Sequence, residues 1–183
     1  AEADARGYPL TVVGVPKTID NDIVHTDCCP GFGSAAKYLA TSVREVGLDL
    51  VAMTTSSGRA FVLEVMGRNA GWLAGACALA AEGPGQAPHL ILLPEVPFDE
   101  PAFMHRVQEV VERVGCCAIV VAEGLRGPDG RILAMQRESK GYIQLGGAGE
   151  VIADRIAASL GYKVHYAVAD YLQRAARDTQ SVV

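Results

Sequence analysis

Residues 11–23 read TVVGVPKTIDNDI, an apolar run that ends in a cluster of polar side chains. The β-branched residues of the run are typical of a buried strand, so we expect a strand over residues 10–15. The cluster supplies a cation, a hydroxyl group and two carboxylates from Lys17, Thr18, Asp20 and Asp22. Polar groups directly after a strand are typical of α/β enzymes, whose active sites lie at the carboxyl ends of the strands.

The rest of the chain alternates short apolar runs with amphipathic segments. Further strands are expected over residues 61–65, 90–93, 118–121 and 163–166. Helices are expected over residues 32–46, 70–81, 100–114 and 148–160. Gly47 is expected to end the first of these helices, and the turn-rich residues 124–147 are expected to form an exposed excursion. Strands separated by such helices predict an α/β fold with parallel sheets that helices cover on both faces.

Composition limits the class of protein. The 183 residues, half of them hydrophobic, can bury one sizeable core or parts of two lobes. A net charge of −5 argues against a nucleic-acid-binding protein, which would show a basic stripe. No apolar run approaches the roughly 18 residues that cross a bilayer, and the start AEADARGYPL does not resemble a signal peptide, so we expect a cytoplasmic protein. The five cysteines show no CxxC spacing and are expected to be reduced structural thiols.

The two aspartates of the PKTIDND loop can take different roles, because side chains two residues apart in an extended loop point in different directions. Asp20 can accept a proton from an attacking hydroxyl group while Asp22 binds Mg²⁺. Lys17 and Thr18 can then stabilise a transferring phosphoryl group, whose charge spreads over its equatorial oxygens. A structural alternative is that Asp20 to Asp22 form an Asx-type turn and that Lys17 is a solvated surface charge.

Several motifs, in order along the chain, resemble those of the phosphofructokinase family. PKTIDND at 16–22 resembles the signature loop of the family, and EVMGR at 64–68 resembles its fructose 6-phosphate loop. Glu123, at the end of an expected strand, resembles its sugar-binding glutamate. QLGGAGE at 144–150, followed by YLQR at 171–174, resembles its closing stretch. The resemblance covers nearly the whole chain, and ordered matches are more specific than any single motif.

The resemblance implies a two-lobed fold with three-layer, Rossmann-like parallel sheets, and transfer of a phosphoryl group to the 1-hydroxyl of fructose 6-phosphate. It makes Asp20 the base, Lys17 and Thr18 catalytic groups that act on the transferred phosphoryl group, and Asp22 a ligand of Mg²⁺. The implied substrate-binding residues are Thr18, Asp20, Arg59, Met66, Gly67, Arg68, Glu123, His165, Tyr171 and Arg174. Arg59 matches an arginine that the family lends across a subunit interface, so a homodimer or homotetramer is implied.

Read alone, several of these residues also have structural explanations. Arg59 and Arg68 could be solvated charges at the ends of strands, Met66 could belong to the core, and Glu123 could cap the turn at Gly124. The chain also departs from the family at two positions, with His165 where an arginine is usual and Asp170 where a glycine is common. Histidine is only partly charged near neutrality and cannot form the bidentate contacts that arginine makes with phosphate. These departures put the affinity for the sugar phosphate in question.

The glycine-rich donor loop that the family carries upstream is absent, so we interpret the chain as the middle of a longer enzyme. Residues 1–31 are expected to be the tail of the donor-binding lobe, residues 32–171 the fructose 6-phosphate-binding lobe, and residues 172–183 a return towards the first lobe. The isolated chain is then expected to be inactive. A non-catalytic sugar-phosphate-binding module and a different α/β kinase with convergent chemistry are the alternatives.

The phosphoryl donor is suggested by Lys17. Many pyrophosphate-dependent members of the family carry lysine where the common bacterial ATP-dependent enzymes carry glycine, so we favour pyrophosphate. Some ATP-dependent members also carry the lysine, and ATP therefore remains the alternative.

Overall fold

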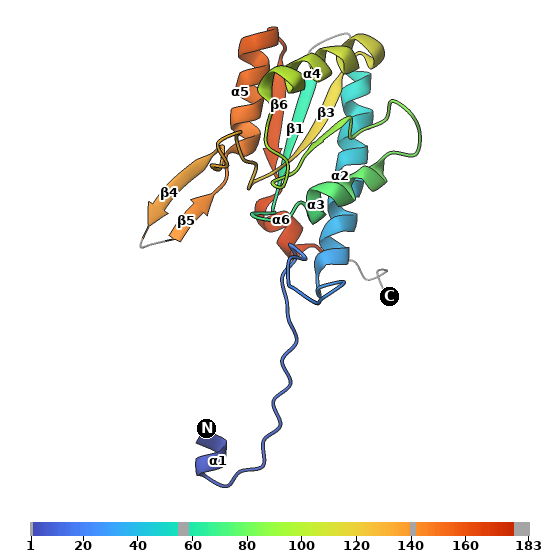
Figure 1. The fold of residues 1–183 in the computed structure, drawn as a ribbon. Helices are drawn as coiled ribbons and strands as arrows, with labels where there is room; N and C mark the ends of the chain where they lie inside the picture. Colours follow the sequence, from blue (N-terminus) through green and yellow to red (C-terminus); the bar gives the residue numbers. More distant parts are fainter. Residues whose placement is uncertain (1, 55–58, 140–141, 178–183) are drawn as a thin grey trace.

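The structure is a computed structural model that describes residues 2–54, 59–139 and 142–177 (Figure 1). Its helices and strands are, in order, α1 (Glu2–Ala5), α2 (Phe32–Ala52), β1 (Ala60–Val65), α3 (Trp72–Ala76), the 3₁₀ helix η1 (Cys77–Ala80), β2 (Leu90–Leu92), α4 (Glu100–Val114), β3 (Cys117–Ala122), β4 (Met135–Ser139), β5 (Tyr142–Leu145), α5 (Ala148–Leu160), β6 (Val164–Val168) and α6 (Asp170–Ala175).

Four of the strands form a parallel sheet in the order β2-β3-β1-β6. The central strand β1 places Leu63 opposite Val120 of β3 and opposite Ala167 of β6. All three pairings are parallel, so the carboxyl ends of the four strands lie at the same end of the sheet. The expected α/β fold with a parallel sheet is confirmed.

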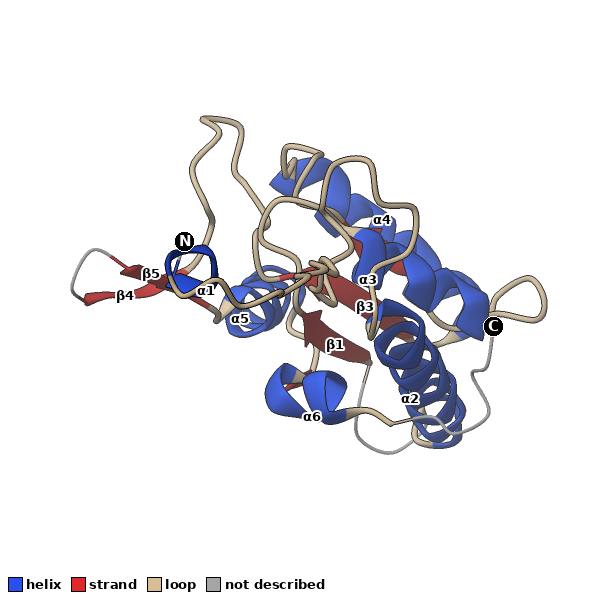
Figure 2. Cartoon of the chain, turned by 90° about the horizontal axis from the view of Figure 1, so that it is seen from below, coloured by secondary structure: helices blue, strands red, loops and turns tan. Residues whose placement is uncertain are grey.

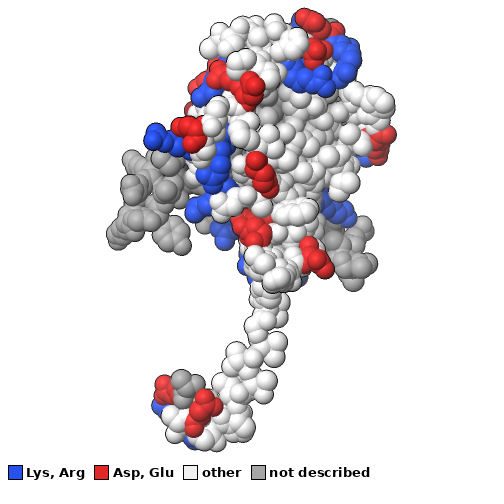
Figure 3. All heavy atoms as spheres, viewed as in Figure 1, with Lys and Arg blue, Asp and Glu red and all other residues white. Residues whose placement is uncertain are grey.

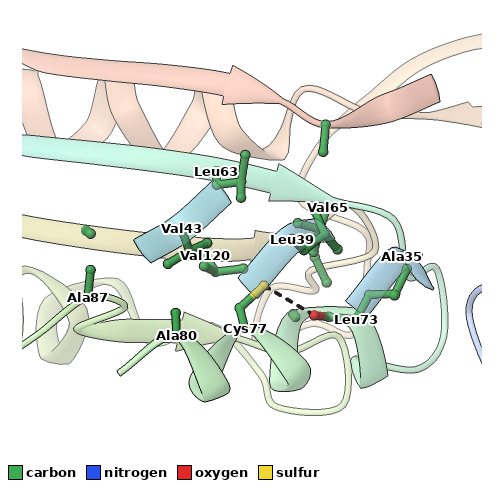
Figure 4. Close-up of a cluster of buried hydrophobic side chains, with 14 of the residues drawn as sticks. Ala35, Leu39, Val43, Leu63, Val65, Leu73, Cys77, Ala80, Ala87 and Val120 are labelled. Atoms are coloured by element: carbon green, nitrogen blue, oxygen red, sulfur yellow. Dashed lines mark hydrogen bonds between the residues drawn. The ribbon is translucent and has the colours of Figure 1, made fainter. Parts of the chain in front are cut away.

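Helices lie on both sides of this sheet (Figures 1 and 2). Neighbouring residues of β1 point to opposite faces, as the period of two in a strand requires. Leu63 packs with Leu39 of α2 and Leu73 of α3 in one buried cluster, which Figure 4 shows in close-up. Val62 belongs to a second cluster, which α4 and α5 cover. The chain thus builds two apolar layers around one sheet.

Some expected element boundaries were wrong. The first long helix does not end at Gly47 but continues to Ala52. A Cβ atom at Gly47 would lie 2.5 Å from the Cβ of Ala87, so this glycine allows the helix to pack closely against the loop before β2. The expected helix over residues 70–81 is divided into α3 and η1, and α6 was not expected.

The expected strand over residues 10–15 was wrong. These residues are extended but form no strand with any described segment, and Val12 and Val13 are 80% and 79% exposed. In Figure 1 this part of the chain leads away from the sheet towards α1, and in Figure 3 it is free of charged side chains. A strand needs a hydrogen-bonded neighbour, which the described part of the chain does not provide here.

The turn-rich residues between β3 and α5 leave the sheet, as expected. Strands β4 and β5 pair as an antiparallel hairpin that projects from the body (Figure 1). On the face shown in Figure 3, acidic and basic side chains are interspersed rather than gathered by sign. Among the described helices, none combines the length and the apolar character needed to span a membrane.

Candidate active site

A pocket of about 390 Å³ lies where the PKTIDND loop meets the carboxyl ends of the central strands. Its lining comes from the loop, from the residues after β1 and β3, and from α6. The lining residues are Lys17, Thr18, Ile19, Asp20, Asp22, Met66, Arg68, Asn69, Glu123 and Arg174. Ligands of parallel α/β sheets bind at this end of the strands.

The pocket brings together eight of the residues that the sequence singled out. They are Lys17, Thr18, Asp20, Asp22, Met66, Arg68, Glu123 and Arg174. Gly67 lies between two of them, whereas Arg59, His165 and Tyr171 are not in the lining. Sequence reasoning missed Asn69, although this residue directly follows the EVMGR motif.

One buried side chain anchors the PKTIDND loop. Ile19 is 6% exposed and belongs to the apolar cluster of α2 and α3. The backbone N–H of Asp20 donates a hydrogen bond of 3.2 Å to the Thr18 hydroxyl, which closes a tight local turn. With Ile19 pointing into the core, Thr18 and Asp20 are held in the pocket wall.

Asp20 has the electrostatic surroundings of a functional carboxyl group. Burial raises its pKa above the ordinary value, and the nearby negative charge of Asp22 raises it further. The positive charges of Arg68, Lys17 and Arg174 act in the opposite direction. A carboxyl group at a pocket wall whose pKa is raised in this way is a candidate for general acid–base chemistry.

Glu123 lines the pocket because backbone hydrogen bonds between the chain segments of β3 and β1 continue past the last residues of both strands. The N–H of Glu123 donates to the carbonyl of Val65 at 2.9 Å, and the N–H of Gly124 donates to the carbonyl of Gly67 at 3.1 Å. A Cβ atom at position 124 would lie 2.0 Å from the carbonyl oxygen of Arg68, so only glycine fits there. Burial raises the pKa of Glu123. Glu123 therefore does more than cap a turn, since it also lines the pocket.

Helix α6 is fastened to the end of β1 at two points. The N–H of Ala169 donates to the carbonyl of Glu64 at 2.9 Å, and the N–H of Met66 donates to the buried Gln173 side chain at 3.2 Å. The guanidinium group of Arg174 lies 4.9 Å from the centre of the Tyr171 ring. Tyr171 thus supports Arg174 from outside the pocket, and Gln173 is a positioning residue that sequence reasoning missed.

A model of the family described as "Phosphofructokinase" matches residues 2–181. The chain belongs to the phosphofructokinase family. It is 53% identical over 182 residues to a pyrophosphate–fructose 6-phosphate 1-phosphotransferase of Xanthomonas campestris pv. campestris (strain B100), with 98% of this chain and 44% of the relative covered. A more distant relative is an ATP-dependent 6-phosphofructokinase of Clostridium perfringens, 37% identical over 90% of this chain and 44% of the relative.

Phosphofructokinase structures also share the fold. The crystal structure of a pyrophosphate-dependent phosphofructokinase from Marinobacter aquaeolei superposes with a TM-score of 0.80 at 47% identity. The match covers 96% of this chain and 41% of that structure. The chain therefore spans less than half the length of these relatives.

Arg59 and His165 lie away from the pocket of this phosphofructokinase chain. Arg59 directly precedes β1, at the amino end of the sheet, and its guanidinium group donates to the carbonyl of Gly115 at 3.3 Å. His165 is exposed on the edge strand β6, where its backbone pairs with Phe61. Neither side chain lines the pocket of its own chain.

The pocket carries the acidic groups that a phosphate-bound metal ion needs. No group of three or more histidine, cysteine, aspartate or glutamate side chains within the described ranges is close enough to hold a metal by itself. Asp20 and Asp22 line the same wall, and Asp22 is exposed. Mg²⁺ is commonly held by one or two carboxylates and completed by phosphate oxygens and water, so this pair fits Mg²⁺ that arrives with a phosphate.

Proposed function

We propose that this chain belongs to an enzyme that transfers a phosphoryl group from pyrophosphate to the 1-hydroxyl of fructose 6-phosphate, giving fructose 1,6-bisphosphate. The supporting observation is the pocket, in which three carboxyl groups and three cationic side chains meet. The names of the relatives support the choice of substrates.

In the proposed reaction Asp20 accepts the proton of the 1-hydroxyl group as the sugar oxygen attacks the phosphorus atom. Its raised pKa suits this role, because a base works best when its pKa lies near the operating pH. Lys17 and Arg68 stabilise the negative charge of the transferring group, and the Thr18 hydroxyl positions it. The leaving group is inorganic phosphate.

The sugar phosphate is proposed to bind along the other wall of the pocket. Arg174, supported by Tyr171, can form a bidentate contact with the 6-phosphate. Glu123 accepts hydrogen bonds from sugar hydroxyl groups. Met66 and Gly67 hold the sugar through the chain segment that follows β1, which Gln173 and Gly124 fix from two sides.

Mg²⁺ is the proposed cofactor, with Asp22 as its protein ligand on the pocket wall. The ion would supply positive charge that neutralises the phosphate oxygens during transfer. Asp20 and Asp22 have distinct tasks in this proposal, because Asp20 is half-buried and Asp22 is exposed.

A second copy of the chain is proposed to complete the site. Arg59 and His165 would serve a neighbouring pocket, in a homodimer or homotetramer, because neither reaches the pocket of its own chain. We further propose that residues 32–171 form the sugar-phosphate lobe, residues 1–31 the tail of the donor lobe and residues 172–183 the return segment.

Pyrophosphate is favoured over ATP because of Lys17. Pyrophosphate has no nucleoside to bind, so its affinity must come from cations on its oxygens, and Lys17 places one beside Asp20. The ATP-dependent relative keeps ATP as the second candidate donor.

The test is a donor assay on the full-length protein at matched free Mg²⁺. Fructose 1,6-bisphosphate should form from pyrophosphate, and the reaction should run in both directions. Lys17→Gly should lower kcat/KM for pyrophosphate at least about tenfold, equivalent to about 1.4 kcal/mol of transition-state stabilisation. Robust use of ATP without any pyrophosphate activity would contradict the donor assignment, and absence of activity with both donors would contradict the proposed function.

A further inference from the structure

The loop over residues 20–29 carries both pocket carboxylates but has no regular secondary structure. Asp20 and Asp22 line the pocket, while the residue between them, Asn21, points into the protein and is only 7% exposed. In a loop without helix or strand hydrogen bonds, side chains must hold the backbone in place. Asn21 is the buried polar side chain at this position.

Both polar atoms of the Asn21 side chain are used. Its Oδ1 accepts a hydrogen bond of 2.8 Å from the N–H of Cys29, and its Nδ2 donates one of 3.2 Å to the carbonyl of Asp27. The two bonds tie the start of the loop to its end, six and eight residues further along the chain. Cys29 is itself 1% exposed, so the far end of the loop is fixed in the protein interior.

The backbone at Asn21 is also unusual. Its φ of 56° lies in the left-handed region, where asparagine is among the few side chains tolerated at low cost. The two aspartates on either side of this residue differ in exposure, since Asp20 is half-buried and Asp22 is exposed. Residue type, hydrogen bonding and backbone conformation therefore agree at this one position.

We propose that Asn21 is a positioning residue that holds Asp20 and Asp22 in their separate roles. This inference rests on the proposed function, and it assigns to Asn21 no contact with substrate. Without the Asn21 side chain, no other side-chain hydrogen bond among the described residues joins the two ends of the loop, so Asp20 and Asp22 are held less firmly. The groups that bind the sugar come from β1, β3 and α6, so they should keep their places.

The test compares two substitutions in the full-length enzyme. Asn21→Gly keeps the left-handed backbone without strain and removes both side-chain hydrogen bonds. His25→Gly is the matched control, because His25 has a φ of 61° in the same loop but an exposed side chain. Asn21→Gly should lower kcat about 10-fold to 100-fold with KM for fructose 6-phosphate within about threefold, the pattern of a lost transition-state interaction. His25→Gly should leave both values near those of the wild type.

Partial rescue separates positioning from a merely structural role. Asn21→Asp tolerates the left-handed backbone and keeps an acceptor for the N–H of Cys29, so it should retain more of kcat than Asn21→Gly, again with KM for fructose 6-phosphate within about threefold. Asn21→Asp also provides the decisive kcat and KM values if the glycine variant does not fold.

The wild-type enzyme tests the proposed function, and the Asn21 variants test the positioning role separately. An inactive wild-type enzyme contradicts the proposed function itself. An active wild type whose Asn21 variants keep kcat within about twofold of the wild-type value contradicts the positioning role. A rise in KM with kcat unchanged contradicts it too, because that pattern would place Asn21 in substrate binding.

Discussion

The two ends of the parallel sheet differ in what their side chains do. At the carboxyl ends, Arg68 and Glu123 face one pocket together with the PKTIDND loop. At the amino ends, Arg59 is exposed and His89 is bound to the backbone of Ala118. The six residues of β1 span about 20 Å, farther than an arginine side chain extends. Arg59 and Arg68 therefore cannot serve one pocket of the same chain, although only nine residues separate them.

The largest expected effect is at the carboxyl end. Asp20→Ser in the full-length enzyme should lower kcat by about two to four decades with a smaller change in KM, because the reaction loses its base. Steady-state kinetics at saturating substrate measure the change. Asp27→Ser, which alters an exposed aspartate in the same loop, is the control. Unchanged kcat in Asp20→Ser would remove Asp20 from that role.

The next effect tests whether Arg59 acts in a neighbouring copy. Arg59→Ala should lower kcat/KM for fructose 6-phosphate about 10-fold to 100-fold, because a charge-assisted contact with the phosphate is lost. An equal mixture of Arg59→Ala and Asp20→Ser chains should then recover about a quarter of wild-type activity as a dimer, since each hybrid has one intact site.

Activity of refolded mixtures is the measurement, with each variant alone as the control. No recovery from mixed chains, while both variants assemble normally, would place the function of Arg59 within its own chain or outside catalysis.

A smaller effect concerns His165. If a neighbouring copy presents it to the 6-phosphate, His165→Arg should lower KM for fructose 6-phosphate a few-fold, because arginine carries a full charge and can form bidentate contacts with phosphate. His165→Gln, which is neutral throughout, should raise KM instead. KM values that do not respond to either substitution would show that His165 does not face the phosphate.

The smallest effect tests the structural role of the amino end. His89 accepts a hydrogen bond of 2.8 Å from the N–H of Ala118, and its other ring nitrogen lies 3.1 Å from the carbonyl of Gly85. Burial lowers the pKa of His89, and the positive charge of Arg113 lowers it further. The folded protein therefore favours the neutral form of His89. The stability that this gives is fully present above the unfolded pKa of about 6.5. It is lost as the pH falls through the lower pKa that His89 has in the folded protein.

Denaturant unfolding between pH 5 and 8 should show this contribution, which we expect to be below about 1 kcal/mol because solvent screens a half-buried group. His89→Ala should reduce the loss of stability at low pH. His25→Gly is the control, since that side chain is exposed and glycine keeps its left-handed backbone. An unchanged pH dependence in His89→Ala would exclude His89 as its source.

Much of the fold could be predicted from the sequence, because period and composition report local structure. The apolar runs of β1 and β3 and the amphipathic pattern of α4 located these elements within a residue or two. The strand over residues 10–15 could not be judged in this way, since β-branched residues indicate a preference and a strand also needs a neighbour. Gly47 looked like the end of a helix because close packing against Ala87 leaves no trace in the local pattern.

The sequence by itself determined which chemical groups are available, and in which order: the cation, hydroxyl group and carboxylates of the PKTIDND loop, then Arg68, Glu123 and Arg174. Only the tertiary structure decided which of them meet, because convergence on one pocket depends on parallel strands whose carboxyl ends share an edge. The tertiary structure also placed Arg59 and Arg68 at opposite ends of the sheet. It showed which hydrogen bonds hold the pocket wall in place: Asn21 bonds within its own loop, and Gln173 bonds to Met66, which is distant in the chain. Local sequence encodes propensity and chemistry, whereas proximity between distant residues arises only from packing.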